Sequence, residues 1–398
     1  MNLESSYISV SGIGTKVGGI VANVAGESLV NDCTSNIVIE VYDGSAGGVV
    51  GGISGGRSGA DKVEYTEEDE QRGPFSIVKN CSFGGTIRQK REDSMSSLGG
   101  VAAGNEGNLE NCVNYGTIYF GARDTDRVGG IVASAGGIIS GCENAGTLMC
   151  TLEEGVEPSD TSVCAGGIAG KMFMSSTGSK KYMSRLATIT NCKNTGTVTG
   201  TMSVGGIVGS AYDPVQKDGN GKCSLEMQKC SNSGEITVLQ INGYLGGIAA
   251  NWGMGGIPSV IGRCSNTGKL FVNNQVLTEE QKKEIENSNM FTLSRIVGGI
   301  IGKVGKGLYL STDNDEGNYK YINSEDAFFQ IIHCENTGEI EINDPEEYRD
   351  KTGKIVYRNY IGGILGNVSG EKEYSVRTEG CTCSSTEYQI GNEGLSED

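Results

Sequence analysis

The chain has 398 residues, of which 64 are glycine and only five are proline, and its formal net charge is −17. Glycine at this density without a Gly-X-Y period excludes collagen, and scarce proline with modest charge favours tight turns between short strands over disorder. The acidic balance argues against nucleic acid or an anionic membrane as a partner, because both require a surface rich in lysine and arginine.

The N-terminal segment, from Met1 to Ser6, has no basic stretch followed by an apolar one, so it does not read as a signal peptide. No apolar run in the chain approaches the about 18 residues of a transmembrane helix. We therefore expect either a cytosolic protein or a mature or trimmed piece of an exported one.

A seven-residue pattern, Cys-x-Asn-x-Gly-x-aliphatic, recurs along the chain. Close copies begin at Cys112, Cys142, Cys192, Cys230, Cys264 and Cys334, and weaker copies begin at Cys33, Cys81 and Cys381. The spacing between Cys81, Cys112 and Cys142 is 31 and then 30 residues. This length suits one coil of a solenoid, made of three short strands and their turns.

A second pattern, an apolar residue followed by Gly-Gly and an aliphatic residue, alternates with the first. It occurs at 17–20, 98–101, 128–131, 165–168, 204–207, 245–248, 297–300 and 361–364. Its phase stays open, because Ile207 and Val208 are both apolar although neighbouring strand residues face opposite ways. Either a bulge follows the glycines or this sheet is covered on its outer side.

The recurring residues of the cysteine pattern stand at every second position, from Cys112 through Asn114 and Gly116 to Ile118, so they share one face of a strand. Glycine this frequent would cost a helix about 1 kcal/mol at each occurrence. The sequence therefore predicts an all-β protein, a right-handed parallel β-helix (β-solenoid) of about nine coils of about 30 residues with loop and short-helix insertions.

Stacked coils place equivalent residues above one another, so the pattern predicts ladders of buried cysteine and asparagine. A free cysteine behaves as a small apolar residue, but neighbouring rungs also lie within reach of a disulfide, and both states remain open. The asparagine amides are expected to hydrogen-bond from coil to coil. Zinc is disfavoured because Cys381-x-Cys383 stands alone, without a second cysteine pair.

We expect one solenoid repeat domain over residues 1–370 and a degenerate last repeat or C-terminal cap over 371–398. Insertions are predicted at about 55–73, 150–163, 170–186, 212–223, 273–295, 310–327 and 344–357. Within them, Thr278-Glu279-Glu280-Gln281 has the pattern of a capping box and predicts a short polar helix through Glu286.

No catalytic set emerges from the residue types. The only histidine, His333, stands in a repeat position that precedes the ladder cysteine, and alternation aims it away from Cys334. Acidic runs such as Glu67 to Glu70 fall in the predicted loops, where charge is usually solvated. Asp313 and Asp315 lie in an oxygen-rich segment that is a weak calcium candidate, with an ordinary polar turn as the alternative. No other cofactor is expected.

The alternation of the two patterns resembles the GLUG-type repeats of bacterial surface proteins, most closely in the Val-Gly-Gly-Ile-Val-Gly run at 204–209 and its counterpart at 297–302. The resemblance covers most of residues 11–370. GLUG repeats occur in adhesin-like proteins of gut anaerobes and, outside the catalytic part, in some large secreted peptidases, so it implies a secreted or cell-surface protein and a piece of a larger surface polypeptide.

The function we expect is that of a non-catalytic extracellular β-solenoid, an adhesin or ligand-presenting spacer module on a bacterial surface. Its partner would be a glycan or protein ligand on a host or microbial surface, without nucleic acid and without membrane insertion. The alternative is a carbohydrate-active β-helix enzyme, a polysaccharide lyase or glycosidase that uses loop carboxylates.

Overall fold

The structure is a computed structural model that describes residues 1–12, 14–54, 76–90, 96–121, 127–151, 163–173, 187–212, 225–239, 243–254, 259–273, 293–306, 328–343, 357–369, 375–384 and 388–390. The elements in these ranges are the strands β1 to β44, and their pairing between successive coils is parallel throughout. The described ranges contain no helix long and apolar enough to cross a membrane. The prediction of an all-β parallel solenoid is confirmed.

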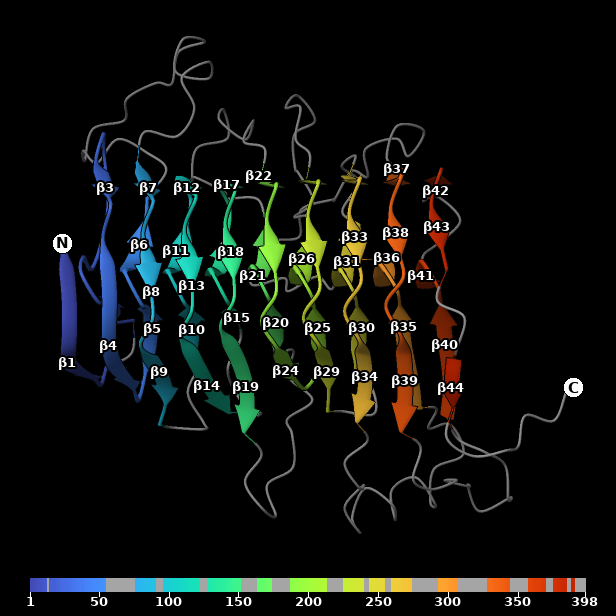
Figure 1. The fold of residues 1–398 in the computed structure, drawn as a ribbon, viewed down its shortest axis with the longest axis horizontal. Helices are drawn as coiled ribbons and strands as arrows, with labels where there is room; N and C mark the ends of the chain where they lie inside the picture. Colours follow the sequence, from blue (N-terminus) through green and yellow to red (C-terminus); the bar gives the residue numbers. More distant parts are fainter. Residues whose placement is uncertain are drawn as a thin grey trace, which may run out of the picture.

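Each coil runs in turn through four sheets, which we name D, A, B and C (Figure 1). Sheet D contains β3 (Leu29–Asn31), β7 (Ile77–Lys79), β12 (Asn108–Glu110), β17 (Ile138–Ser140), β22 (Ala187–Thr190), β27 (Leu225–Gln228), β32 (Ser259–Gly262), β37 (Phe328–Ile332) and β42 (Ser375–Glu379).

Sheet A has two strands in most coils, separated by a short interruption. The first row contains β8 (Ser82–Phe83), β13 (Val113–Asn114), β18 (Glu143–Asn144), β23 (Lys193–Asn194), β28 (Ser231–Asn232), β33 (Ser265–Asn266), β38 (Glu335–Asn336) and β43 (Thr382–Cys383). The second row contains β9 (Thr86–Gln89), β14 (Thr117–Gly121), β19 (Thr147–Thr151), β24 (Val198–Gly200), β29 (Ile236–Val238), β34 (Leu270–Asn273), β39 (Ile340–Asn343) and β44 (Tyr388–Ile390). At the N-terminal end, β4 (Thr34–Val41) spans both rows and pairs with β1 (Asn2–Val10).

Sheets B and C come from the glycine pattern. Sheet B contains β2 (Lys16–Gly18), β5 (Gly44–Gly47), β10 (Ser96–Gly99), β15 (Arg127–Gly129), β20 (Cys164–Gly166), β25 (Ser203–Gly205), β30 (Tyr244–Gly246), β35 (Leu293–Gly298) and β40 (Tyr357–Gly362). Sheet C contains β6 (Val50–Ile53), β11 (Ala102–Asn105), β16 (Val132–Ala135), β21 (Ala169–Phe173), β26 (Val208–Tyr212), β31 (Ala249–Met254), β36 (Ile301–Lys306) and β41 (Leu365–Ser369). Sheets B and D each have nine strands, which agrees with the predicted nine coils.

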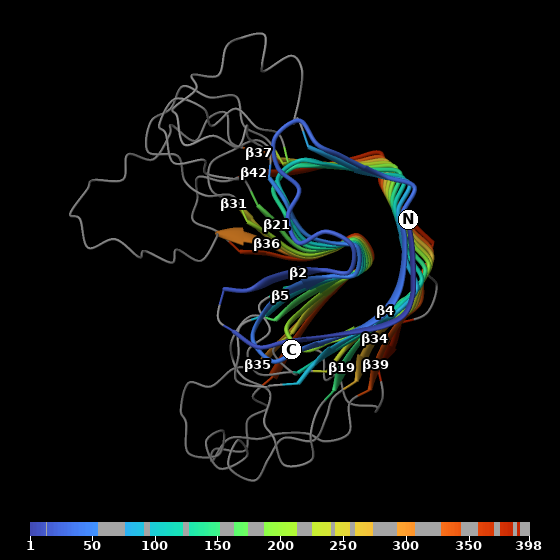
Figure 2. The same ribbon diagram turned by 90° about the vertical axis from the view of Figure 1, so that its left-hand side faces the viewer.

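The coil is more elaborate than the three strands expected from its length. Sheets D and A form a curved outer wall, whereas sheets B and C fold back into the coil as a pair whose turn reaches the interior (Figure 2). The turn is the Gly-Gly-Ile element. Strands of only two to five residues fit this extra fold into a coil of about 30 residues.

The two glycines let the turn pack so closely against neighbouring backbone that no side chain would fit at either position. A Cβ on Gly205 would overlap the carbonyl oxygen of Val208 across the turn, and one on Gly206 would overlap the carbonyl oxygen of Gly247 in the next coil. A Cβ on Gly206 would also lie 2.6 Å from Cγ of Asn232. In coils three to eight the turn therefore rests on the asparagine ladder, whereas in coils one and two it meets Ser35 and Phe83, so the two sequence patterns occur together.

Two explanations were left open for the adjacent apolar residues after Gly-Gly, a bulge or a covered outer side, and the structure shows both. On β16 the residues that join the apolar core are Val132 and Ala135, three positions apart, and the pairing register on both sides passes over Ala133. Strict alternation is thus interrupted after the glycines. Ala133 is nonetheless buried, because sheet B covers it.

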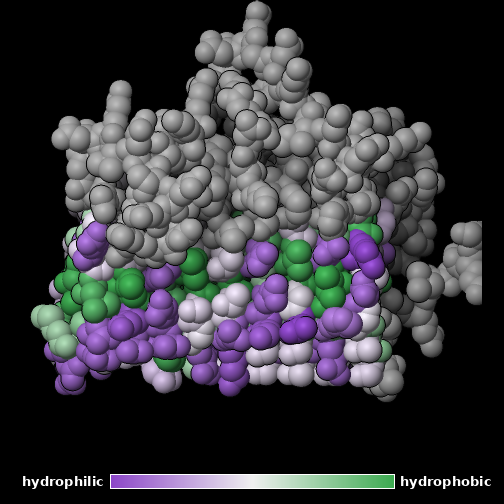
Figure 3. Space-filling view, turned by 90° about the horizontal axis from the view of Figure 1, so that it is seen from above, coloured by the Kyte–Doolittle hydropathy of each residue, from purple (hydrophilic) through white to green (hydrophobic). Residues whose placement is uncertain are grey.

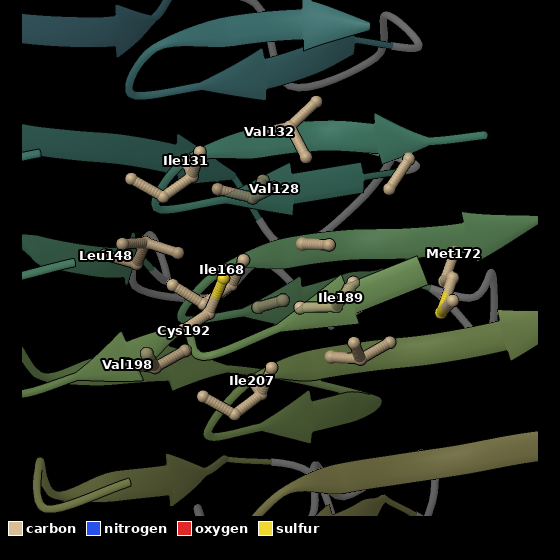
Figure 4. Packing of buried hydrophobic residues seen from close by; sticks show 14 of the residues in the cluster. Val128, Ile131, Val132, Leu148, Ile168, Met172, Ile189, Cys192, Val198 and Ile207 are labelled. Carbon is tan, nitrogen blue, oxygen red and sulfur yellow. The ribbon is translucent and has the colours of Figure 1, made fainter. Parts of the chain in front are cut away.

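The apolar core is one continuous column. Equivalent residues of successive coils stack on each other, as Ile131, Ile168 and Ile207 do in Figure 4. Each is fully buried, and the backbone N–H of Ile131 donates to Ile168 just as that of Ile168 donates to Ile207. At coil seven, Trp252 on β31 packs its ring edge-on against Phe329 on β37, with centroids 5.3 Å apart.

A left-handed residue makes the corner between sheets D and A. The φ angle lies between 51° and 55° at Asp32, Asn80, Asn111, Asn191, Lys229, Arg263 and His333, and glycine fills the same place at 141 and 380. Every one of these residues directly precedes a ladder cysteine. His333 is exposed and Cys334 is buried, so the two side chains face opposite ways as predicted.

The gaps between the described ranges lie between sheets C and D or between sheets A and B, except for 385–387, which lies between β43 and β44 within sheet A. The seven predicted insertion ranges lie next to these junctions, but several extend into flanking strands, as at 150–151 in β19, 273 in β34 and 293–295 in β35. Residues 170–173, which sequence reasoning assigned to an insertion, belong to β21, where Met172 is buried in the core. The helix predicted from Thr278 to Glu286 lies outside the described residues.

Candidate functional site

The outward sides of sheets B and C face each other, and the seam between them, which we call the cleft, opens into a cavity in its N-terminal part. The ribbons of the two sheets meet at the glycine turn and diverge from it toward the left of Figure 2. On sheet B the cleft side carries the residue two positions before the first glycine, which is Lys16, Ser45, Ser97, Arg127, Cys164, Ser203 and Tyr244 in coils one to seven. The facing column of sheet C reads Asn23, Gly52, Gly104, Ser134, Lys171, Ser210 and Asn251.

The mouth of this cleft lies between the ends of the strands of sheet C and the beginnings of the strands of sheet B, on the left of Figure 2.

The N-terminal third of the cleft contains a cavity of about 250 Å³. It is lined by Lys16, Asn23, Ser45, Gly51, Gly52, Ile53, Ser54, Ser97, Ala103, Gly104, Asn105, Glu106, Arg127, Ser134 and Phe173. Hydroxyl, amide and cationic groups dominate, and Glu106 is the single carboxylate in this lining. A pair of facing carboxylates, which glycoside hydrolysis requires, is not formed by these residues.

Further along the rod, larger side chains occupy the same cleft. Lys303 on β36 places its Nζ 4.9 Å from the ring centroid of Tyr244 on β30 and donates to the Tyr244 hydroxyl over 3.4 Å. This contact bridges sheets B and C, so the cleft is open at its N-terminal end and crossed by side chains in coils seven and eight.

The asparagine ladder is buried and belongs to the architecture. Each Nδ2 donates to the Oδ1 of the next coil, at 2.7 Å from Asn114 to Asn144, from Asn144 to Asn194 and from Asn194 to Asn232. The ladder continues through Asn266 to Asn336 at 2.7 and 2.8 Å. All six residues are at most 1% exposed. No amide of this ladder is available to a ligand.

The cysteine ladder is equally internal. The nine cysteines that precede the repeated asparagine positions are free thiols, and Cys230 is typical, with its Sγ 3.5 Å from the carbonyl oxygen of Ile189 in the coil before. Burial raises the pKa of the Cys230 thiol, and the thiols of Cys192 and Cys264 in the adjacent coils raise it further. The thiol therefore stays protonated and unreactive in the folded chain.

The outer face of sheet A carries charged and aromatic side chains in register. The guanidinium of Arg88 lies 5.0 Å from the ring centroid of Tyr119, and Lys269 lies 5.6 Å from that of Phe271. Tyr7 donates a 2.6 Å hydrogen bond to Glu40, and this bond holds the pKa of the Glu40 carboxyl below its usual value. These pairs lie on the outward face of sheet A and do not line the cavity between sheets B and C.

The outer face of sheet D is mixed. Its column alternates half-buried apolar residues such as Ile77 and Ile138 with polar ones such as Asn108 and Thr188. In Figure 3, which looks onto this side of the rod, hydrophobic and hydrophilic residues accordingly lie side by side. The described part of this face forms no continuous apolar patch.

The calcium candidates Asp313 and Asp315 lie outside the described residues, as do the acidic runs at Glu67 to Glu70 and at Asp344 to Glu347. Among the residues that are described, no group of three or more His, Cys, Asp or Glu side chains is placed to hold a metal ion. The calcium prediction therefore stays a prediction.

Sequence reasoning did not find the cleft. Its signal was nevertheless present in the polar or charged residue that stands two positions before Gly-Gly in several coils, as at Lys16, Ser97 and Arg127. Those residues alternate with core residues such as Leu98 and Val128, as on any strand with one buried face, so the sequence did not distinguish a cleft from open solvent at these positions.

Comparisons of the chain with protein-family models, with curated proteins and with solved structures found no match.

Proposed function

We propose that the chain is a non-catalytic β-solenoid that holds a ligand, acting as an adhesin or a ligand-presenting spacer module on a bacterial surface. The observation that carries the proposal is the polar cleft between sheets B and C. Its lining changes from coil to coil, whereas the ladders behind it repeat. A rod with an invariant interior and a variable cleft suits recognition, because side chains in the cleft can change without loss of the fold.

The location and the partner follow from the resemblance to GLUG-type repeats. A surface protein of that kind would be secreted, would form part of a larger polypeptide and would meet a glycan or a protein on a host or microbial surface. The net charge of −17 fits a partner that is neither a nucleic acid nor an anionic membrane.

A carbohydrate-active enzyme is the second candidate, and one observation favours it. The cavity is a polar groove that a polysaccharide could enter, and Glu106 places a carboxylate in its described lining. Against it stands the described lining of the cavity, in which Glu106 has no second carboxylate as a partner.

The test is an incubation of the whole chain with a broad panel of plant, bacterial and host polysaccharides. New reducing ends and unsaturated products are measured over a day, and retention of the protein on the same immobilised polysaccharides is measured in parallel. The proposal predicts retention on at least one surface glycan or protein, without product. Release of product from any member would replace it with the enzyme alternative.

A further inference from the structure

The cavity between coils one and four exists because two side chains are missing. Gly52 and Gly104 occupy the sheet C column where later coils carry Lys171, Ser210, Asn251 and Lys303. They face the small side chains of Ser45 and Ser97, which lie on the opposite wall of the same cavity.

These two glycines are not demanded by the backbone. A Cβ on Gly104 would meet no atom within 4 Å, and one on Gly52 would make only ordinary contacts, the nearest 3.4 Å from Oδ1 of Asn23. Neither has a φ angle in the left-handed region. By contrast, a Cβ on Gly99, in the turn of the same coil, would overlap the carbonyl oxygen of Ala102. The packing of the turn therefore requires glycine at position 99, whereas the backbone at position 104 would accept a side chain. The absence of a side chain at Gly104 has to be explained in another way.

Two cations stand at the ends of this space. Lys16 and Arg127 share one column of sheet B, three coil steps apart, which corresponds to about 14 Å at the spacing of stacked strands. Lys16 is exposed where the cavity opens at the N-terminal end, and Arg127 is half-buried at the other end. Only Glu106 adds a negative charge to the described lining, although the chain as a whole carries −17.

The guanidinium of Arg127 is held in place by one hydrogen bond, but one of its buried donors has no partner. Its Nη1 donates to the Ser134 hydroxyl over 3.1 Å, which ties β15 to β16 across the cleft. Its Nε is buried and has no hydrogen-bond partner within the described part of the chain. A buried donor without a partner is costly, and an anionic acceptor in the cavity would satisfy it.

The walls favour a carbohydrate over a peptide. The backbone N–H and C=O groups of sheets B and C are used between coils, so an extended peptide finds no free strand edge to pair with inside the cleft. The groups that remain are the hydroxyls of Ser45, Ser97 and Ser134, the amide of Asn23, and the two cations. Hydroxyl and amide groups match sugar hydroxyls, and the cations match acidic substituents.

We propose that this cavity binds a short acidic oligosaccharide, with one carboxylate or sulfate at Arg127, a second at Lys16, and sugar hydroxyls on the serines between them. The proposal rests on the ligand-holding function given above and assigns its ligand class and its site. The glycines at 52 and 104 leave the room for the sugar rings.

The test is isothermal titration of the whole chain with trigalacturonate and with a chondroitin sulfate tetrasaccharide, with maltotriose as the neutral control. We expect saturable binding of at least one acidic probe, weakened by added salt, and no binding of maltotriose. Arg127→Gln and Gly104→Leu should each weaken binding at least tenfold, the first by removing the charge and the second by filling the cavity. Lys303→Gln, in the same cleft but outside the cavity, should leave binding unchanged.

The other possible results of the titration tell a failure of the proposed cavity site apart from a failure of the ligand-holding function. Binding that survives both Arg127→Gln and Gly104→Leu overturns the site. Failure of both acidic probes overturns the ligand class, and retention on some other surface glycan or protein would then leave the ligand-holding function in place. Equal binding of a tri-glutamate peptide would show an anion site without preference for sugar and would overturn the carbohydrate assignment. The fluorescence of Trp252, the single tryptophan, reports whether each variant is folded.

Discussion

The substitution Asn194→Asp tests the asparagine ladder without changing the shape of the side chain. Asn194 accepts from Asn144, donates to Asn232 and also donates to the carbonyl oxygen of Gly196 over 3.0 Å. An ionised carboxylate could still accept from Asn144, but it would turn an oxygen toward the Oδ1 of Asn232 inside a fully buried site. A protonated carboxyl group could donate to that oxygen and restore the ladder.

The expected effect therefore depends on pH in a defined direction. Burial and the opposing oxygen raise the folded-state pKa of the introduced carboxyl group above its unfolded value of about 3.9. A raised pKa leaves stability intact below about pH 4 and removes it as pH rises, by about 1.4 kcal/mol per unit, until the folded-state pKa is passed. At pH 7, about three units above the unfolded value, the loss reaches about 4 kcal/mol, with about 1 kcal/mol more for the missing bond to Gly196.

Urea unfolding followed by the fluorescence of Trp252 measures this difference at pH 5.5, 6.25 and 7, for wild type and variant side by side. The difference in unfolding free energy should grow by about 2 kcal/mol over that range. Thr199→Asp is the matched control, because Thr199 lies on the outward face of the same coil between Met149 and Thr237. A difference that does not change with pH, or one no larger than that of the control, would refute the buried and paired ladder.

Three further expectations follow from the same contacts. Gly206→Ala should lower the free energy of unfolding in urea by about 3 kcal/mol, because its Cβ meets the backbone of the next coil. Gly104→Ala, the control, should change that free energy by less than about 0.5 kcal/mol, and similar losses for both variants would contradict the packing of the turn. Lys229→Gly should raise the free energy of unfolding in urea by about 0.5–1 kcal/mol, since φ is 55° there and strains a side chain; a lowered unfolding free energy would contradict the left-handed corner. In native protein an aromatic disulfide reagent should label the exposed Cys383 and leave Cys230 unlabelled even at pH 9, because burial raises the pKa of the Cys230 thiol; rapid native labelling of Cys230 would show that the ladder opens.

The ladders were predictable from sequence because each is fixed by one local rule repeated in every coil. Period-two spacing places Cys192, Asn194 and Val198 on one face of the strand, and the stacking of coils then sets equivalent residues above one another. The left-handed corner was readable in principle, since Asn, Asp or Gly precedes six of the nine ladder cysteines. Lys229, Arg263 and His333 obscure this pattern, because the pairing of the coils holds them at a positive φ angle that these residue types rarely adopt.

The cleft was not predictable, because it depends on contacts between patterns far apart in each coil. Nothing in the local sequence around Gly206 indicates that the turn enters the interior and rests on Asn232. Once that contact is known, Arg127 and Ser134 must face each other across a cleft, although both read as solvent-facing positions in a flat sheet. The loss of side chains at Gly104 is likewise invisible in a sequence in which glycine is common everywhere.

A crystal structure of the chain soaked with trigalacturonate tests the central claim most directly, because it shows the infolded sheets and their occupant together. The account predicts the ligand between β10 and β11, with one carboxylate against Nε of Arg127 and another within reach of Lys16. Sheets B and C that do not fold inward, or a ligand bound to the outer face of sheet A, would contradict it.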